Sequence, residues 1–370
     1  MKKNVRVLAI YLPQYHPIPE NDNCWGKGFT EWTNVAMAKP LFKGHYQPRI
    51  PADLGFYDLR VPEVREAQAA LAKEAGIEGF MYWHYWLGNG KRLLERPFNE
   101  VLQSGKPDFP FCLGWANHTW SSKTWNARNK GVKRITIAEQ TYPGEEDYVK
   151  HFYTVLPAFK DYRYITVHGK PFFLIHNVLD IPDLKMFMGI WQDLAAKNGL
   201  PGIHFVGNVM GMRNEMRCLD IFNSGVDATT WGNFSQAMQK SSGNTLAFIW
   251  KKFWSRIAHI SYERYNYRDI INNIHNEYET WDNIYPMVYP QLDRTPRSGR
   301  DAVMFCNSTP ALFEQYLRDT INIVEQKEDA ENRFIIINAW NEWGEGNYVE
   351  PDMKYGDGYL KAIHNALYDE

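Results

Sequence analysis

Eight short apolar runs recur along the 370-residue chain, and they restrict its fold more than any other feature. Each run is apolar through its length and does not alternate with polar residues, which is typical of strands buried on both faces of a parallel sheet. The runs are Val5–Tyr11, Gly79–Trp83, Phe109–Trp115, Pro171–His176, Ile203–Asn208, Val226–Trp231, Ile284–Tyr289 and Phe334–Asn338. Helical patterns accompany them at Pro62–Ala75, Glu145–Phe159, Ile181–Asn198, Arg268–Thr280, Pro310–Gln326 and Tyr359–Leu367.

This alternation predicts an α/β fold, a (β/α)8 TIM-type barrel, with a doubly wound open sheet as the alternative. No internal repeat, low-complexity tract or Pro/Gly-rich linker divides the sequence, so we expect residues 1–370 to form a single domain. The long connections 16–60 and 232–267 are expected to lie over the carboxyl face of the barrel and to form cleft walls. Their tryptophans could stack on sugar rings or serve packing alone: Trp25, Trp32, Trp250 and Trp254.

Composition restricts the compartment and the partners. The net charge of -2 argues against nucleic acid or an anionic membrane as the main partner. No apolar run approaches the roughly 18–20 residues needed to span a bilayer, and no secretory cleavage site follows the N-terminal lysines. The four cysteines are widely spaced, which suits a reducing compartment. We therefore expect a cytoplasmic protein with no membrane span, and no protein partner is implied.

Polar and aromatic side chains follow the predicted strands, where a barrel would gather them at one face. The chain contains 14 Trp and 22 Tyr residues. Side chains of these types can stack on sugar rings while their polar edges form hydrogen bonds with hydroxyl groups. A single histidine here could equally be structural, but the recurrence across strands predicts a cleft that binds an oligosaccharide or polysaccharide. The candidate substrate-binding residues are Tyr11, Tyr15, His16, Trp83, His84, Trp115, Asn117, His118, Trp120, His176, Asn208, Trp231, Tyr289, Asn338, Trp340, Asn341 and Trp343.

Two acidic residues follow the last strand, Glu342 and Glu345, and their neighbours are Trp and Gly residues instead of other charges. Glycosidic bond chemistry needs one carboxyl group that carries a proton and a second that stays ionised. Two close acids in a Trp-lined pocket supply that division, because repulsion and desolvation raise the pKa of one of them. Glu342 and Glu345 are therefore the predicted catalytic pair.

The sequence lacks the common motifs for binding a metal ion or a phosphate-containing cofactor. The chain contains no HExxH motif, no EF-hand loop and no carboxylate–histidine cluster at ligand spacing, although strand ends could still assemble a site. It also contains neither GxGxxG nor GxxxxGK[ST], the loops that cradle phosphates. We expect no metal and no cofactor.

The segment Asn341-Glu-Trp-Gly-Glu-Gly346 resembles the catalytic segment of glycoside hydrolase family 99, the endo-α-1,2-mannosidases and mannanases. Four further segments resemble the WbsX-type family of bacterial O-antigen and polysaccharide clusters, often labelled glycosyltransferases. They are Ala9-Ile-Tyr-Leu-Pro-Gln-Tyr-His16, Trp25-Gly-Lys-Gly-Phe-Thr-Glu-Trp32, Tyr82-Trp-His-Tyr-Trp86 and Phe111-Cys-Leu-Gly-Trp-Ala-Asn117. These segments extend over nearly the whole chain.

The resemblance implies a (β/α)8 barrel and retaining, metal-independent chemistry. By motif position, Glu342 would deprotonate the substrate 2-hydroxyl to form a 1,2-anhydro sugar, and Glu345 would act first as general acid and then as base. An endo-acting hydrolase of α-mannosides or of O-antigen-like polysaccharide is the first hypothesis. A glycosyltransferase of lipopolysaccharide, O-antigen or capsule biosynthesis is the second, and a non-catalytic carbohydrate-binding protein is the third.

Overall fold

The computed structural model describes residues 3–121, 135–209, 215–243, 246, 249–250, 253–254 and 263–368. Within these residues, eight parallel strands pair in the order β1-β2-β4-β8-β9-β10-β12-β14, and β14 returns to pair with β1. The strands are β1 Arg6–Tyr11, β2 Gly79–Trp86, β4 Phe111–Trp115, β8 Lys170–Ile175, β9 His204–Asn208, β10 Ala228–Trp231, β12 Ile284–Val288 and β14 Phe334–Ile337. The predicted TIM-type barrel is confirmed, and all eight expected strands are present.

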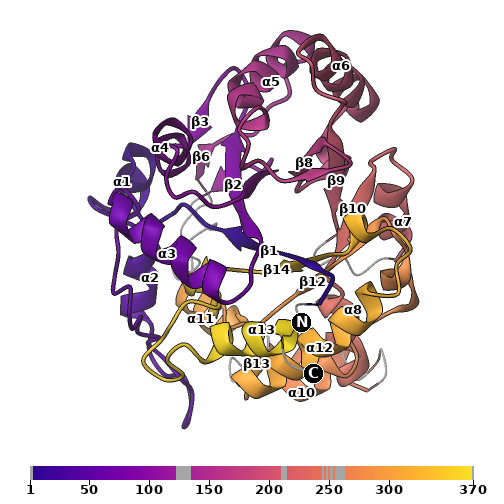
Figure 1. Ribbon diagram of the computed structural model, residues 1–370. Helices are drawn as coiled ribbons and strands as arrows, with labels where there is room; N and C mark the ends of the chain where they lie inside the picture. The colour runs from indigo at the N-terminus through magenta and orange to yellow at the C-terminus, as the bar shows by residue number, and fades with distance from the viewer. Residues whose placement is uncertain are drawn as a thin grey trace.

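Helices surround the barrel between successive strands (Figure 1). They are α3 Pro62–Glu74, α4 Arg96–Ser104, α5 Glu145–Phe159, α6 Leu184–Lys197, α7 Glu215–Phe222, α12 Pro310–Val324 and α13 Gly358–Tyr368. The strands are apolar on both sides because one side fills the barrel and the other packs beneath these helices. In β14, for example, residues 334–337 all have no exposed surface. The two ends of the chain meet, since the Lys3 N–H donates to the Leu367 carbonyl at 2.8 Å.

One predicted helix is wrong. Arg268–Thr280 was expected to be continuous, but α10 spans Tyr267–Ile271 and a separate 3-10 turn, η2, spans Glu277–Thr280. The Asn276 side chain accepts a hydrogen bond from the Tyr278 N–H and so caps the second turn. Asparagine favours such caps over helix interiors because its side chain bonds nearby backbone groups.

Two long connections bring additional elements to the barrel. The connection after β1 contains α1 Pro19–Trp25 and α2 Glu31–Met37, and the one after β12 contains α11 Thr295–Ser298 and β13 Val303–Cys306. Helix α2 packs against α11 and against η5, the 3-10 turn Trp343–Glu345 that follows β14.

The four tryptophans of the predicted cleft walls, in connections 16–60 and 232–267, have different environments. Trp32 is buried and packs on Trp343, with ring centroids 5.4 Å apart, so it serves packing. Trp25 packs against Phe29, with ring centroids 4.8 Å apart. Trp250 and Trp254 are exposed and contact one another.

Candidate active site

The segment after β14 turns both predicted catalytic carboxylates toward one cavity. Glu342 ends β15 Asn341–Glu342, and Glu345 ends η5, after which Gly346 adopts a left-handed φ of 55°. The side chains beside them are fixed in the interior: Asn341 accepts a hydrogen bond from the Leu12 N–H at 2.7 Å. Trp343 stacks on Tyr348, with ring centroids 3.7 Å apart.

One buried arginine joins the two carboxylates. Arg297 of α11 donates from Nη2 to Glu342 Oε2 at 2.7 Å and from Nη1 to Glu345 Oε1 at 2.6 Å. A second arginine, Arg294, lies 2.9 Å from the same Glu345 oxygen, and its side chain is 46% exposed. The two acids therefore share a guanidinium group, and Glu345 has an additional cationic partner at the more exposed side.

The surroundings shift the pKa values of the two acids in opposite directions. Burial is the main reason that the pKa of Glu342 rises to about 7, with further contributions from Glu345 and Glu31 against the lowering effect of Arg297. Burial also acts to raise the pKa of Glu345, but Arg294 and Arg297 together outweigh it and lower the pKa. In the free protein at neutral pH, Glu345 is ionised, while Glu342 holds a proton part of the time.

A cavity of about 270 Å³ contains both carboxylates. Its lining consists of Trp83, Tyr85, Ala116, His118, His176, Phe234, Tyr289, Leu292, Arg294, Arg297, Val303, Asn338, Glu342, Glu345 and Asn347. Indole, phenol, imidazole and amide groups therefore surround the acids. Burial lowers the pKa of His118 to about 4 and that of His176 to about 3, so both rings are neutral near pH 7.

Seven of the predicted site residues line this cavity, and the others lie elsewhere. Trp83, His118, His176, Tyr289, Asn338, Glu342 and Glu345 are brought together. The expectation that all strand-end residues face one cleft is wrong for Tyr11, Tyr15, His16, His84, Trp115, Asn117, Trp120, Asn208, Trp231, Trp340, Asn341 and Trp343, which are buried outside the lining.

Strand geometry explains this division, because successive side chains of a strand point to opposite faces. In β2, Trp83 and Tyr85 face the cavity, whereas His84 points away and its Nε2 lies 2.9 Å from His151 Nε2 in α5. The same reasoning could have identified Tyr85, which was missed.

Several residues outside the lining support the site. Asn208 Nδ2 lies 2.7 Å from His176 Nδ1 and orients that ring. Trp120 packs edge-on against Tyr85, with ring centroids 5.0 Å apart, and the Tyr15 hydroxyl donates to the Asn341 carbonyl.

The two arginines of the site are harder to identify from the sequence. Arg294 and Arg297 both lie in the connection after β12, which ends at Val288, and the course of this connection could not be predicted. The third carboxylate partner of Arg297, Glu31, lies 266 positions earlier in the chain.

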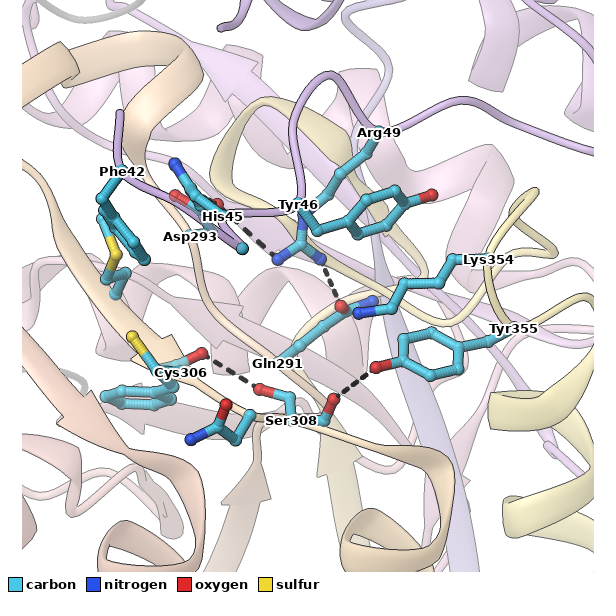
Figure 2. A pocket seen from close by; sticks show the side chains of 14 residues that line it. Phe42, His45, Tyr46, Arg49, Gln291, Asp293, Cys306, Ser308, Lys354 and Tyr355 are labelled. Carbon is cyan, nitrogen blue, oxygen red and sulfur yellow. Dashed lines mark hydrogen bonds and ion pairs between the residues drawn. The ribbon is translucent and has the colours of Figure 1, made fainter. Parts of the chain in front are cut away.

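A second, polar pocket of about 120 Å³ is lined by His45, Arg49 and Asp293 among other residues (Figure 2). Asp293 in this lining accepts a hydrogen bond from Gln47 Nε2 at 2.7 Å, and the Asp293 backbone N–H donates to the Glu345 carbonyl at 2.6 Å. Burial acts to raise the pKa of Asp293, but the His45 hydrogen bond and the Arg49 charge lower it to about 2. Asp293 therefore links this pocket to the backbone at Glu345.

The residues that the structure describes contain neither a metal-binding cluster nor a helix able to span a membrane. In those ranges, no group of three or more His, Cys, Asp or Glu side chains is arranged to hold a metal ion. No helix in the same part of the chain combines the length and apolar character needed to cross a membrane.

Proteins of similar sequence match nearly the whole chain. Two proteins named WxcX, from Xanthomonas campestris pv. campestris strains B100 and ATCC 33913, are each 33% identical to this chain over 98% of its length. The chain spans about half of these relatives, 49% of each, and their function is uncharacterized.

Solved structures share the fold at low sequence identity. A glycoside hydrolase-like protein aligns with a TM-score of 0.62 and 14% identity, covering 99% of this chain and 94% of that protein. The family 99 endo-α-mannosidase from Bacteroides thetaiotaomicron aligns with a TM-score of 0.55 and 14% identity, covering 100% and 97% of the two chains. The family model for glycosyltransferase WbsX matches residues 7–363, so this chain belongs to the WbsX family.

Proposed function

We propose that the protein is a retaining glycoside hydrolase that cleaves within an α-linked oligosaccharide or polysaccharide, with Glu342 and Glu345 as its catalytic carboxylates. The observation that carries the proposal is the shared guanidinium group: Arg297 bonds both acids inside a cavity lined by Trp83 and Tyr289. An aromatic cavity binds sugar faces, and two close carboxylates with different proton affinities supply acid–base chemistry at the glycosidic bond.

Glu342 suits the role of base. A catalytic base is most effective when its pKa lies near the working pH, and burial raises the pKa of Glu342 to about 7. Its ionised form would accept the proton of the sugar 2-hydroxyl, and the hydroxyl oxygen would displace the leaving group. Arg297, bonded to Glu342 at 2.7 Å, holds the carboxylate in place.

Glu345 must carry a proton to assist the leaving oxygen, yet Arg294 and Arg297 lower its pKa in the free protein. Arg294 is about half exposed, so a bound sugar can displace it from Glu345. Loss of that cation, together with exclusion of water, would raise the pKa and protonate Glu345. Substrate binding and acid activation are therefore coupled through Arg294.

The charges of the free protein also fit the reverse division of roles. Glu342 would then donate the proton, and Glu345 would be the ionised group that attacks or stabilises positive charge. The two divisions differ in which Glu→Gln variant recovers activity on a substrate with an activated leaving group.

A glycosyltransferase is the second candidate, because the matching family model carries that description. Such an enzyme of lipopolysaccharide, O-antigen or capsule biosynthesis would use a nucleotide-sugar or lipid-linked donor. Both arginines among the described cavity residues, Arg294 and Arg297, are bonded to glutamates, so a donor phosphate would have to compete with carboxylates for them. This pairing favours hydrolysis.

A panel of α-linked oligosaccharides, including mannans and O-antigen fragments, tests the proposal. We expect one class of glycan to release new reducing ends with the wild-type protein and none to do so with the double variant Glu342→Gln/Glu345→Gln. The hydrolase proposal is wrong if every glycan stays intact while a nucleotide sugar raises the melting temperature and its sugar is transferred.

A further inference from the structure

Glu31 is a third carboxylate on the arginine that joins the catalytic pair. It is the first residue of α2, has no exposed surface, and does not line the cavity. Its Oε1 accepts from Arg297 Nε at 3.0 Å and its Oε2 accepts from Arg297 Nη2 at 3.1 Å.

We propose that Glu31 is a positioning residue, which fixes Arg297 at the place where its guanidinium group joins Glu342 and Glu345. This inference rests on the proposed catalytic role of those two acids. It also gives a function to the segment 25–32, which the site itself does not explain.

The geometry of the contact supports this role. Two parallel hydrogen bonds along the Nε–Nη2 edge fix the plane of the guanidinium group as well as its distance from Glu31. In that plane, Nη2 also reaches Glu342 and Nη1 reaches Glu345. If Glu31 lost these bonds, Arg297 could rotate and the separation of the two acids would no longer be set.

The glycine between the two catalytic acids leaves space for this contact. A Cβ atom on Gly344 would lie 1.6 Å from Glu31 Oε1 and 3.0 Å from Arg297 Nε. The backbone of Gly344 is not in the left-handed region, so the requirement for glycine comes from space alone. Glu31 and Gly344 are therefore needed together, although they are distant in sequence.

Glu31 also acts on the catalytic pair through its charge. The charged and titratable groups around Glu342 are Glu31 from α2, Arg297 from α11, Glu345 from η5, Arg294 from the preceding connection, Tyr15 after β1 and Tyr85 from β2. Ionised Glu31 raises the pKa of Glu342. Replacing Glu31 with Gln keeps its shape and one acceptor oxygen for Arg297 Nε, so the guanidinium group should stay beside Glu342. The substitution removes only the charge, so the pKa of Glu342 should fall.

Carbon-13 NMR of labelled glutamate carboxyl groups tests this effect without a substrate. The Glu342 signal is assigned by its absence in Glu342→Gln and titrated in the wild type and in Glu31→Gln. We expect a midpoint near pH 7 in the wild type and a clearly lower one in Glu31→Gln. Glu63→Gln, which removes an exposed acid from the first turn of α3, is the matched control and should leave the midpoint unchanged. An unchanged midpoint in Glu31→Gln overturns the electrostatic effect of Glu31 on the pair, and the positioning role itself is decided by Gly344→Ala.

Gly344→Ala gives a second test that changes no charge and holds even if Glu31→Gln folds poorly. The new methyl group should displace the Glu31 carboxylate and lower kcat/KM by roughly 10²-fold, the effect of a misplacement of about 1 Å, with KM little changed. In the background of Glu31→Ala, which makes room for the methyl group, the same substitution should have almost no further effect. Equal losses from Gly344→Ala in both backgrounds would show that Glu31 is not responsible.

The two proposals fail in different ways. Wild-type turnover in folded Glu342→Gln and Glu345→Gln would refute the catalytic assignment, whatever the titration gives. If both variants lose turnover but neither the Glu342 midpoint nor the coupling with Gly344 responds to Glu31, the catalytic assignment stands and the positioning role is wrong.

Discussion

The substitution Glu342→Gln should make the protein more stable above neutral pH. Burial is the main cause that raises the pKa of Glu342 from 4.5 to about 7 in the folded protein. Below pH 4.5 the carboxyl group is protonated in both the folded and the unfolded chain. As the pH rises through 7, the group must ionise in the interior, so the stability present at low pH is lost.

The size of the effect follows from that difference in pKa. Each unit corresponds to about 1.4 kcal/mol, so the buried carboxylate costs about 3 kcal/mol at pH 8. An unfolding entropy of about 2.1 cal/mol/K per residue, taken over the 370 residues, converts this into a rise in Tm of about 4 °C. At pH 5 the gain should be much smaller, because folded Glu342 is still protonated there.

Thermal melts followed by circular dichroism at pH 5 and pH 8 measure this difference. Glu345→Gln is the matched comparison and should have the opposite sign at pH 8. Burial opposes ionisation of Glu345, but Arg294 and Arg297 outweigh it and lower its pKa, so its carboxylate stabilises the fold above pH 4.5. If Glu342→Gln melts at or below the wild-type temperature at pH 8, or gains equally at both pH values, the buried-proton explanation is wrong.

Three further predictions concern the cavity. Trp83→Ala should raise KM roughly tenfold with kcat nearly unchanged, because the lost stacking surface stabilises substrate and transition state equally. Steady-state kinetics measure both constants. Asn208→Ala should lower stability by about 1 kcal/mol through loss of the bond to His176, and the His176 ring signals in proton NMR should broaden or shift. Arg294→Gln should change stability by less than about 1 kcal/mol, since the Arg294 side chain is 46% exposed. The acid limb of the kcat/KM–pH profile should move to higher pH, because a cation that lowers the pKa of Glu345 is gone and Glu345 has the lower pKa of the pair. An unmoved limb would contradict the role of Arg294.

Much of the fold could be predicted from the sequence because burial on both faces leaves a simple pattern. The run 334–337 is apolar through its length, and such runs located all eight strands. The helix expected at Arg268–Thr280 failed because a local asparagine cap outweighed the apolar periodicity. Helix α4, Arg96–Ser104, was missed since it is short and rich in polar residues.

The site was only partly predictable for a different physical reason. Glu342 and Glu345 stand beside Trp and Gly residues, which marks them within a single segment. A strand end alone does not show which side chain faces the barrel mouth, so His84 was included and Tyr85 was missed. The role of Arg297 can be recognised only in the folded protein, where α2, α11 and η5 pack together. In the sequence, no local pattern distinguishes Arg297 from a solvated loop arginine.

The most direct test of the catalytic pair compares Glu345→Gln and Glu342→Gln on two substrates, a natural glycoside and one with an activated aryl leaving group. If Glu345 is the acid, Glu345→Gln should lower turnover of the natural glycoside by roughly 10²–10⁴-fold and retain much more activity on the aryl substrate, which needs little protonation. Glu342→Gln should lower turnover of both substrates alike, because assistance at the 2-hydroxyl is needed whatever group leaves. Recovery by Glu342→Gln instead would reverse the two roles. Wild-type rates in both folded variants, or losses explained by unfolding alone, would contradict the carboxylate pair as the catalytic centre.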